Sequence, residues 1–274
     1  MLRGKVIIIT GASSGIGLAS ARLFASHGNR LVLAARSIGK LETLAAEILA
    51  DPSTPPETEI LCVRTDVSVE EDCRNMVEQA LARFGGIDIL VNNAGVSMRA
   101  LFLDVDLSVL HRLMDVNYWG TVYCTKYALP SILKRKGSVV GVISTAGYAG
   151  LPARTGYSSS KFAVRAFLET IRIEHVKDGL HVLVFAPGFT TSNVRVAALT
   201  ADGTPQGESP RDESKMMSAE RVACKLERAI EKRRREVILT FIAHLELFVK
   251  RHLPRKMDRW AYDYMAKEPD SPLK

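Results

Sequence analysis

Short hydrophobic runs alternate with longer amphipathic segments along most of the chain. The first run, Val6-Ile7-Ile8-Ile9, has no polar position between its apolar residues, which is typical of a strand buried on both faces. Runs rich in β-branched residues predict seven strands, at residues 5–10, 30–35, 59–64, 87–91, 138–143, 180–186 and 236–240. Apolar positions with helical spacing predict helices at residues 16–27, 37–50, 68–84, 108–135, 157–176 and 218–234.

This alternation predicts an α/β fold with a doubly wound, Rossmann-type parallel sheet. Right-handed crossovers place helices on both faces of such a sheet, and the ligand crevice lies at the carboxyl ends of its strands. We therefore expect a single domain, with a dinucleotide-binding core over residues 1–240 and a helical extension over residues 241–274. Residues 188–217 are rich in Gly, Ser, Pro and charge, and a connection of this length predicts a substrate lid loop.

A glycine-rich loop directly follows the first predicted strand. It reads Thr10-Gly11-Ala12-Ser13-Ser14-Gly15-Ile16-Gly17, and a predicted helix begins within it. Glycine allows a tight turn and lets the backbone approach a pyrophosphate at the positive end of a helix. Such glycines in isolation often form an ordinary turn, but a place between strand and helix is typical of a dinucleotide site. The cofactor contacts predicted in this loop are Gly11, Ser13, Ser14, Gly15, Ile16 and Gly17.

An arginine stands at the end of the second predicted strand, where an NAD site places an acid for the ribose 2′-hydroxyl. The sequence there is Ala34-Ala35-Arg36-Ser37. Because a guanidinium suits a 2′-phosphate, Arg36 with its neighbour Ser37 favours NADP(H) over NAD(H). The alternative is an arginine that only faces solvent at the sheet edge.

The composition is typical of a folded globular protein in a reducing compartment. Hydrophobic residues make up 47% and charged residues 24% of the 274 positions. The four cysteines stand far apart and form no cluster with metal-ligand spacing, so we expect free thiols, no metal site and a cytoplasmic location. The N-terminal segment is too short for a signal-peptide core, and the apolar stretch 237–249 is shorter than the roughly 20 residues that span a bilayer.

The positive charge of the chain is concentrated in its C-terminal fifth. The formal net charge is +7, and residues 221–274 contain 14 Lys and Arg against 8 Asp and Glu. This region shows no basic motif interleaved with aromatic residues of the kind that nucleic-acid modules carry. We therefore expect a solvated basic face and no nucleic-acid partner.

The predicted extension has an amphipathic pattern. Phe241, Leu245, Phe248 and Val249 recur with helical spacing, and basic and aromatic residues follow over residues 250–264. Such a face suits packing on the same chain, where it would close the pocket, or on a sister subunit. The basic and aromatic residues also suit a lipid headgroup region. We favour packing and keep peripheral membrane contact through residues 241–267 as the alternative.

Several motifs together make the sequence resemble the classical short-chain dehydrogenase/reductase family, from about residue 5 to residue 240. Beside the glycine loop they are Asp66-Val67, Asn92-Asn93-Ala94-Gly95, Asn117 in Val116-Asn117-Tyr118, Ser144, Tyr157-x-x-x-Lys161 and Pro187-Gly188. The resemblance implies an oxidoreductase that transfers a hydride between NADP(H) and a carbonyl or alcohol. It also implies a homodimer or homotetramer.

Tyr157 and Lys161 carry the expected acid/base chemistry. They are four residues apart at the start of a predicted helix, so their side chains share one face. A free tyrosine has a pKa near 10, and the ammonium of Lys161 together with the positive nicotinamide of the oxidised cofactor would favour its ionised form. Tyr157 would then exchange a proton with the substrate oxygen, to which Ser144 donates a hydrogen bond.

The resemblance implies the remaining contacts of the site. Lys161 would bond the nicotinamide ribose beside Tyr157, and Asn117 would hold a water that relays protons from Lys161 to solvent. The other implied cofactor contacts are Asp66 and Val67 at the adenine, and Asn93, Ala94, Gly95, Pro187, Gly188 and Thr190. One residue of this segment is expected to contact the nicotinamide carboxamide. The candidates are Thr190, Thr191 and Ser192.

The substrate is expected to be lipophilic. The predicted pocket walls are apolar, namely Met98, Tyr148, Leu151, Phe189 and Val194. Such walls suit a keto-lipid, a steroid or a retinoid. The same fold could also serve as a non-catalytic NADP(H) sensor or scaffold, although the presence of both Tyr157 and Lys161 favours the enzyme.

Overall fold

Seven parallel strands form one sheet in the computed structural model, which describes residues 1–191, 194–209 and 216–274. The strands are β1 (Val6–Thr10), β2 (Arg30–Ala35), β3 (Glu59–Arg64), β4 (Ile89–Asn92), β5 (Ser138–Val142), β6 (His181–Ala186) and β7 (Glu236–Ile238). Their order is β3-β2-β1-β4-β5-β6-β7, so the winding reverses between β1 and β4. The predicted doubly wound sheet is confirmed, and its ligand crevice is expected where the winding reverses.

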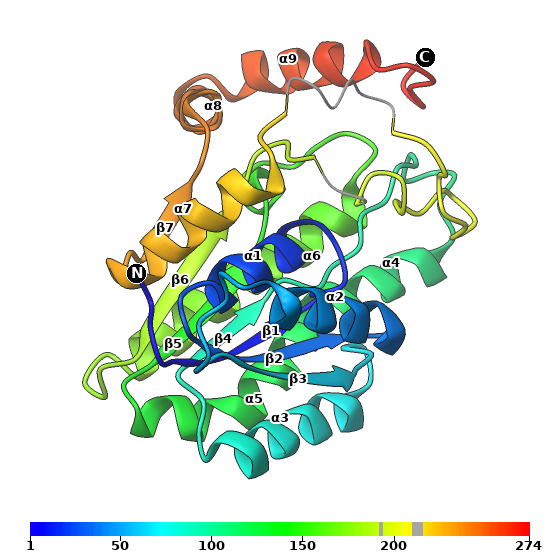
Figure 1. The fold of residues 1–274 in the computed structure, drawn as a ribbon. Helices are drawn as coiled ribbons and strands as arrows, with labels where there is room; N and C mark the ends of the chain where they lie inside the picture. The colour runs from blue at the N-terminus through cyan, green and yellow to red at the C-terminus, as the bar shows by residue number, and fades with distance from the viewer. Residues whose placement is uncertain (192–193, 210–215) are drawn as a thin grey trace.

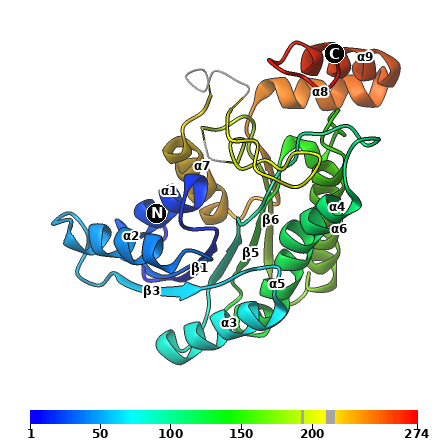
Figure 2. The same ribbon diagram turned by 90° about the vertical axis from the view of Figure 1, so that its right-hand side faces the viewer.

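Two layers of helices cover the two faces of the sheet (Figures 1 and 2). One layer contains α1 (Gly15–Ala25), α2 (Ile38–Ala50) and α7 (Ala219–Glu231). The other contains α3 (Glu70–Phe84), α5 (Gly120–Lys134) and α6 (Thr155–Glu174). Each layer encloses its own buried hydrophobic cluster against the sheet.

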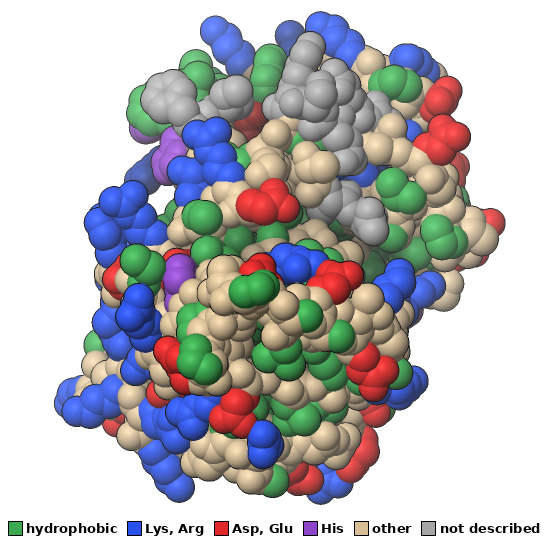
Figure 3. All heavy atoms as spheres, in the orientation of Figure 1, with side chains coloured by type: hydrophobic (Ala, Val, Ile, Leu, Met, Phe, Trp, Pro, Cys, Tyr) green, Lys and Arg blue, Asp and Glu red, His purple; other side chains and the backbone are tan. Residues whose placement is uncertain are grey.

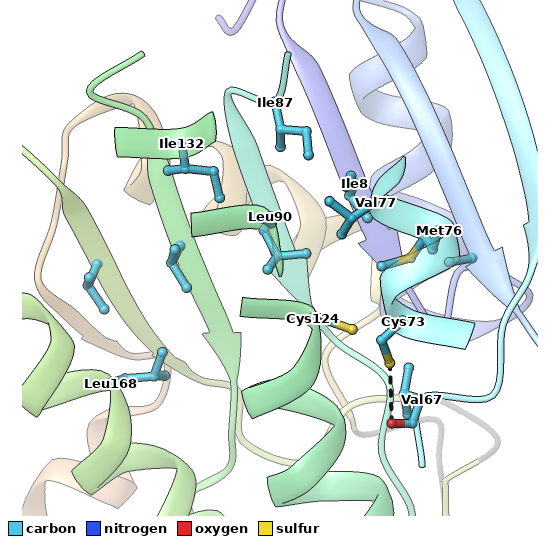
Figure 4. Close-up of a cluster of buried hydrophobic side chains, with 14 of the residues drawn as sticks. Ile8, Val67, Cys73, Met76, Val77, Ile87, Leu90, Cys124, Ile132 and Leu168 are labelled. Carbon is cyan, nitrogen blue, oxygen red and sulfur yellow. Dashed lines mark hydrogen bonds between the residues drawn. The ribbon is translucent and has the colours of Figure 1, made fainter. Parts of the chain in front are cut away.

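β1 is an inner strand of the sheet, and its position explains why its sequence has no polar alternation. Ile7 and Ile9 belong to the cluster under α1, α2 and α7. Val6 and Ile8 point to the opposite face, where Figure 4 shows Ile8 near Met76 of α3. Both faces of β1 are therefore core, and every one of its residues is buried.

The predicted helix over residues 108–135 is divided into three parts. α4 (Leu107–Leu113) leads into a π-helical turn (Met114–Trp119), and α5 follows it. The prediction of one continuous α-helix was wrong here, because the spacing of apolar residues does not reveal a single wider turn. Such turns often occur at functional sites, and this one carries Asn117.

The chain ends in α8 (Phe241–His252) and α9 (Pro254–Ala266), which pack against each other. Figures 1 and 2 place them at the same end of the molecule as the loops that follow β6. Leu245 and Phe248 of α8 are exposed, whereas Met257 and Met265 of α9 are buried. The part of the chain that the structure describes contains no helix long and apolar enough to cross a bilayer.

Candidate active site

A cavity of about 510 Å³ lies at the carboxyl ends of the strands. It is lined by the segments that follow β1, β2, β3, β4, β5 and β6. The predicted site residues among its lining are Gly11, Ser13, Ser14, Gly15, Ile16, Arg36, Ser37, Asp66, Val67, Asn93, Ala94, Gly95, Ser144, Tyr157, Lys161, Pro187, Gly188 and Thr190. Two others, Gly17 and Asn117, lie outside the lining. The fold therefore gathers into one crevice residues that are up to 179 positions apart, from Gly11 to Thr190.

The glycine loop is shaped by close backbone approaches. Gly11 and Gly15 have φ values of +66° and +53°, which side chains rarely adopt. A Cβ on Gly17 would lie 2.3 Å from the carbonyl oxygen of Gly11 and 2.7 Å from Nδ2 of Asn93. Gly17 thus lets α1 pack against the loop from behind, although it does not reach the cavity.

Asn93 and Thr10 fasten the loop to the end of β4. The Thr10 hydroxyl accepts hydrogen bonds from the amides of Asn93 and Ala94 at 3.0 and 3.1 Å. Nδ2 of Asn93 donates to the Thr10 carbonyl at 2.9 Å. These bonds hold the two cavity-lining segments in register, so Asn93 has a positioning contact that the motif alone did not reveal.

The N-terminus of α1 lies at the cavity, because Ser14, Gly15 and Ile16 are among its lining residues. Ser14 at the N-cap makes no side-chain capping hydrogen bond, and no acidic residue lies in the first turn. The first amides of a helix have no partner within the helix, and the helix dipole favours an anion there. The loop therefore fits a pyrophosphate group.

Arg36 and Asp66 line the part of the cavity beside β2 and β3. Arg36 is exposed at the end of β2. Burial acts to raise the pKa of Asp66, but hydrogen bonds from Ser68 and the charges of Arg36 and Arg64 bring it below its usual value. The Asp66 carboxylate accepts from the Ser68 hydroxyl at 2.6 Å, which fixes its orientation.

Tyr157, Lys161 and Ser144 converge at the opposite end of the crevice. The ammonium nitrogen of Lys161 lies 5.9 Å from the centre of the Tyr157 ring and donates to the Val142 carbonyl at 3.0 Å. Burial raises the pKa of Tyr157, while a hydrogen bond with Ser144 and the charge of Arg154 act in the opposite direction. The protein's own groups therefore do not by themselves produce the lowered tyrosine pKa that the sequence suggested.

Burial lowers the pKa of Lys161 from 10.5 to about 8. At neutral pH a pKa shift of this size destabilises the folded state by about 3 kcal/mol. The hydrogen bond from Lys161 to the Val142 carbonyl offsets about 1 kcal/mol of this cost in the wild-type protein. Lys161→Met should therefore raise the free energy of unfolding by about 1–3 kcal/mol at pH 7. Urea unfolding of both proteins measures the difference.

The pH dependence of this gain has a defined sign. Because the pKa of Lys161 is lower in the folded state, the folded protein binds fewer protons between pH 8 and 10.5, and wild type gains stability as pH rises through that window. The excess stability of Lys161→Met over wild type should therefore shrink between pH 8 and 10.5. Replacement of the exposed Lys40 by methionine is the control and should show neither effect. A less stable Lys161→Met protein at pH 7 would contradict the burial argument.

Asn117 lies directly behind the cavity and is fully buried. Its Nδ2 donates to the Val96 carbonyl and to the Ser160 hydroxyl, both at 2.9 Å, and its Oδ1 accepts from the Val96 amide at 2.8 Å. A Cβ on Gly95 would lie 3.0 Å from Oδ1 of Asn117 and 3.3 Å from the ammonium nitrogen of Lys161. Asn117 thus fixes the loop after β4 close to Lys161, and the water relay stays a prediction.

The structure of the segment after β6 favours one of the three candidates for the nicotinamide contact. Thr190 is buried, lines the cavity and donates its hydroxyl to the Gly188 carbonyl at 3.1 Å. Thr191 is exposed and is not among the lining residues. Ser192 lies outside the described residues.

The predicted substrate walls are right in part. Leu151, Phe189 and Val194 line the cavity. Met98 is fully buried in a separate apolar cluster, and Tyr148 is a buried residue whose ring stacks on the Arg165 guanidinium, 4.1 Å from the ring centre. For these two the prediction was wrong, because an apolar residue after a strand fits core as well as pocket.

Sequence reasoning missed several polar and C-terminal lining residues. Among them are Arg154, Arg195, Gln206, Met265 and Glu268. Arg154 lies three residues before Tyr157, and this spacing was the one available signal. The others lie on segments without a recognisable motif.

Comparison with known proteins gives consistent matches. The family model for short chain dehydrogenases matches residues 5–202. The chain is 35% identical over 257 residues to dehydrogenase/reductase SDR family member 7B of Rattus norvegicus, covering 93% of this chain and 79% of that protein. It is 40% identical over 192 residues to 11-beta-hydroxysteroid dehydrogenase A of Sesamum indicum, covering 70% of this chain and 54% of that protein.

Two solved structures share the fold along most of the chain. A short chain dehydrogenase/reductase from Burkholderia phymatum in complex with NAD superposes with a TM-score of 0.82 at 25% identity, covering 93% of this chain and 96% of that one. An alcohol dehydrogenase from Thermococcus sibiricus complexed with 5-hydroxy-NADP gives 0.72 at 28% identity, covering 87% and 96%. One of these structures holds NAD and the other a derivative of NADP, so they do not distinguish the two cofactors.

Proposed function

The chain belongs to the short-chain dehydrogenase/reductase family, and we propose that it is an NADP(H)-dependent enzyme that interconverts a lipophilic ketone or aldehyde and its alcohol. The observation that carries this proposal is the convergence of Tyr157, Lys161 and Ser144 on the cavity that the glycine loop also lines. A perturbed acid/base pair in a cleft beside an anion-binding helix terminus is typical of an active site.

The cofactor would lie in the cavity, along the lining residues described above. The open N-terminus of α1 supports binding of the pyrophosphate, and Arg36 with Ser37 supports binding of a 2′-phosphate. Thr190 and Gly188 would hold the nicotinamide end, and their position in the cavity lining supports this role. When bound, the nicotinamide supplies or accepts the hydride.

The protein's own residues would handle the proton. In reduction the Tyr157 hydroxyl donates its proton to the substrate oxygen as the carbonyl carbon gains the hydride, so the product is a neutral alcohol. Ser144 donates a hydrogen bond to the same oxygen and stabilises its developing charge. The tyrosinate left behind must then regain a proton from solvent. Lys161, with a pKa of about 8, exchanges protons readily near neutral pH, which suits a relay to Tyr157 through the region of Asn117.

The proposed substrate is a mainly lipophilic carbonyl compound. Leu151, Phe189, Val194 and Met265 supply apolar surface at the substrate end of the cavity. The name of the Sesamum indicum relative refers to a hydroxysteroid, which supports a lipophilic substrate class.

Location and assembly are part of the same proposal. Free thiols at all four cysteines support a cytoplasmic protein, and the family supports a homodimer or homotetramer. Lys and Arg side chains are spread over the visible face of the molecule, and some lie at the end that carries α8 and α9 (Figure 3). Peripheral membrane contact there stays a prediction, and flotation with anionic vesicles at low salt tests it.

A panel of lipophilic ketones tests the reaction against the sensor alternative. We expect NADPH consumption with at least one ketone, followed by the absorbance of the reduced nicotinamide, and the matching alcohol should appear in equal amount. Binding of NADPH without turnover on any ketone, and without oxidation of any alcohol, would instead support a sensor.

A further inference from the structure

Two basic residues flank Tyr157 at the start of α6. Arg154 is the N-cap of the helix, Tyr157 lies in its first turn, and Lys161 follows one turn later. Spacings of three and four residues place side chains on one side of a helix. All three residues line the cavity. Tyr157 therefore stands between two basic side chains, of which Lys161 alone was predicted from the sequence.

A strained turn and a hydrogen bond hold the Arg154 guanidinium at this place. Ala153, directly before Arg154, has a φ of +56°, a conformation that residues with side chains rarely adopt. Nη1 of Arg154 donates to the Ala153 carbonyl at 3.2 Å, and the amide of Ala100 donates to the same oxygen at 3.2 Å. Strained backbone persists where the surrounding contacts impose it, and it is frequent at functional sites. The turn before α6 thus gives the guanidinium a defined position.

Lys161 does not keep its positive charge over the pH range in which Tyr157 ionises. Burial lowers the pKa of Lys161 to about 8, whereas burial raises the pKa of Tyr157 above its ordinary value. Lys161 therefore loses its proton before Tyr157 does. A guanidinium stays protonated throughout this range, because its pKa exceeds about 12. Arg154 thus carries a charge that persists when that of Lys161 is lost.

The other charged groups of the cavity come from different segments of the chain. They are Arg36, Asp66, Arg112, Asp115, Arg195 and Glu268. Among the charges of the described residues, that of Arg154 is the one that acts to lower the pKa of Tyr157, together with a hydrogen bond involving Ser144. Position and charge therefore both connect Arg154 to Tyr157.

We propose that Arg154 is a positioning residue of the reaction, whose permanent charge one turn before Tyr157 stabilises the tyrosinate that accepts a proton from an alcohol. In this direction the O–H proton of the alcohol moves to the tyrosinate and the C–H hydride moves to the oxidised nicotinamide. The products are the ketone, neutral Tyr157 and the reduced cofactor. In ketone reduction the same steps run backwards, and Arg154 stabilises the anion that Tyr157 becomes. This inference rests on the proposed oxidoreductase function.

The test is the pH dependence of alcohol oxidation at saturating NADP⁺, with the alcohol of a ketone that the panel identifies. In wild type, kcat/KM for the alcohol should rise with pH as Tyr157 ionises. Arg154→Met should move the midpoint of this rise upward by about one pH unit, because loss of a nearby positive charge disfavours the tyrosinate. Arg154→Gln, a second neutral variant, should show the same shift. Arg154→Lys should keep the midpoint within about half a unit of wild type.

The position of the midpoint separates this role from a structural one. A loss of packing would lower the rates at every pH and leave the midpoint in place. Arg112→Met is the matched control, because Arg112 is another arginine of the cavity lining, on α4. Its midpoint should equal that of wild type. An unchanged midpoint in Arg154→Met, or an equal shift in Arg112→Met, overturns the role of Arg154.

A second readout does not require turnover. Ionised tyrosine has its own ultraviolet absorbance, and the difference between each protein and its Tyr157→Phe counterpart reports on Tyr157 alone. With NADP⁺ bound, Tyr157 in the Arg154→Met protein should ionise about one pH unit above wild type. Equal ionisation of Tyr157 in the two proteins overturns the role of Arg154. Absence of turnover with every ketone and alcohol overturns the proposed function itself, and the absorbance titration still tests Arg154 in that case.

Discussion

Tyr157→Phe should lower kcat for ketone reduction by about 10²–10⁴-fold, the contribution typical of a positioned general acid. The substitution removes only the hydroxyl, so the ring that lines the cavity and lies near Lys161 remains in place. NADPH binding should therefore stay within several-fold of wild type. Steady-state rates at saturating ketone give kcat, and fluorescence titration gives the Kd for NADPH.

Tyr148→Phe is the matched control for this experiment. Tyr148 is buried nine residues earlier in the chain and does not line the cavity, so loss of its hydroxyl should leave kcat nearly unchanged. Comparable turnover in wild type and Tyr157→Phe would remove Tyr157 from the mechanism. An equal loss of kcat in both variants would indicate that the substitutions disturb packing, and not that Tyr157→Phe lacks a proton donor.

The fold could be predicted from local patterns because the burial of each strand determines the pattern of apolar residues in its sequence. β1 is core on both faces, and its run of four aliphatic residues shows it. Strand ends differ from the predicted ones by no more than about two residues, as hydrophobic periodicity allows. The π-helical turn at Met114–Trp119 escaped prediction, because it changes the hydrogen-bond pattern of a helix without changing which residue types it contains.

The cofactor end of the site was accessible to sequence reasoning for a topological reason. The carboxyl ends of parallel strands meet at one edge, so motifs that follow β1, β2, β3, β4, β5 and β6 necessarily gather there. The substrate end has no such rule. Arg99 and Glu268 are brought together from 169 positions apart by loop and tail packing, for which the sequence carries no periodic signal.

Arg36→Asp should invert the cofactor preference from NADPH to NADH. A hydrogen bond between a guanidinium and a phosphate contributes about 1.5–3 kcal/mol, so its loss should weaken NADPH binding by roughly 10- to 150-fold. The new carboxylate should repel the 2′-phosphate and accept a hydrogen bond from the ribose 2′-hydroxyl of NADH. NADH binding should therefore be maintained or improved.

A second consequence follows from Asp66. The charge of Arg36 is one of the influences that lower the pKa of Asp66, so Arg36→Asp removes a cation and adds a second acid beside it. The two acids at positions 36 and 66 should then repel any phosphate within several ångströms, and this repulsion should weaken as ionic strength rises. Measured Kd values for NADPH and NADH at low and high salt test both parts of this argument.

Arg64→Asp separates recognition from general electrostatics. Arg64 is an exposed arginine at the end of β3 that also lowers the pKa of Asp66, but it does not line the cavity. Its replacement changes the local charge by the same amount, and we expect only a small, salt-sensitive loss of NADPH affinity. Equal losses in the two variants would mean that Arg36 acts through its field alone. Equal affinity of wild type for NADH and NADPH at low salt would refute selection by Arg36, since a direct contact with the 2′-phosphate must favour the cofactor that carries it.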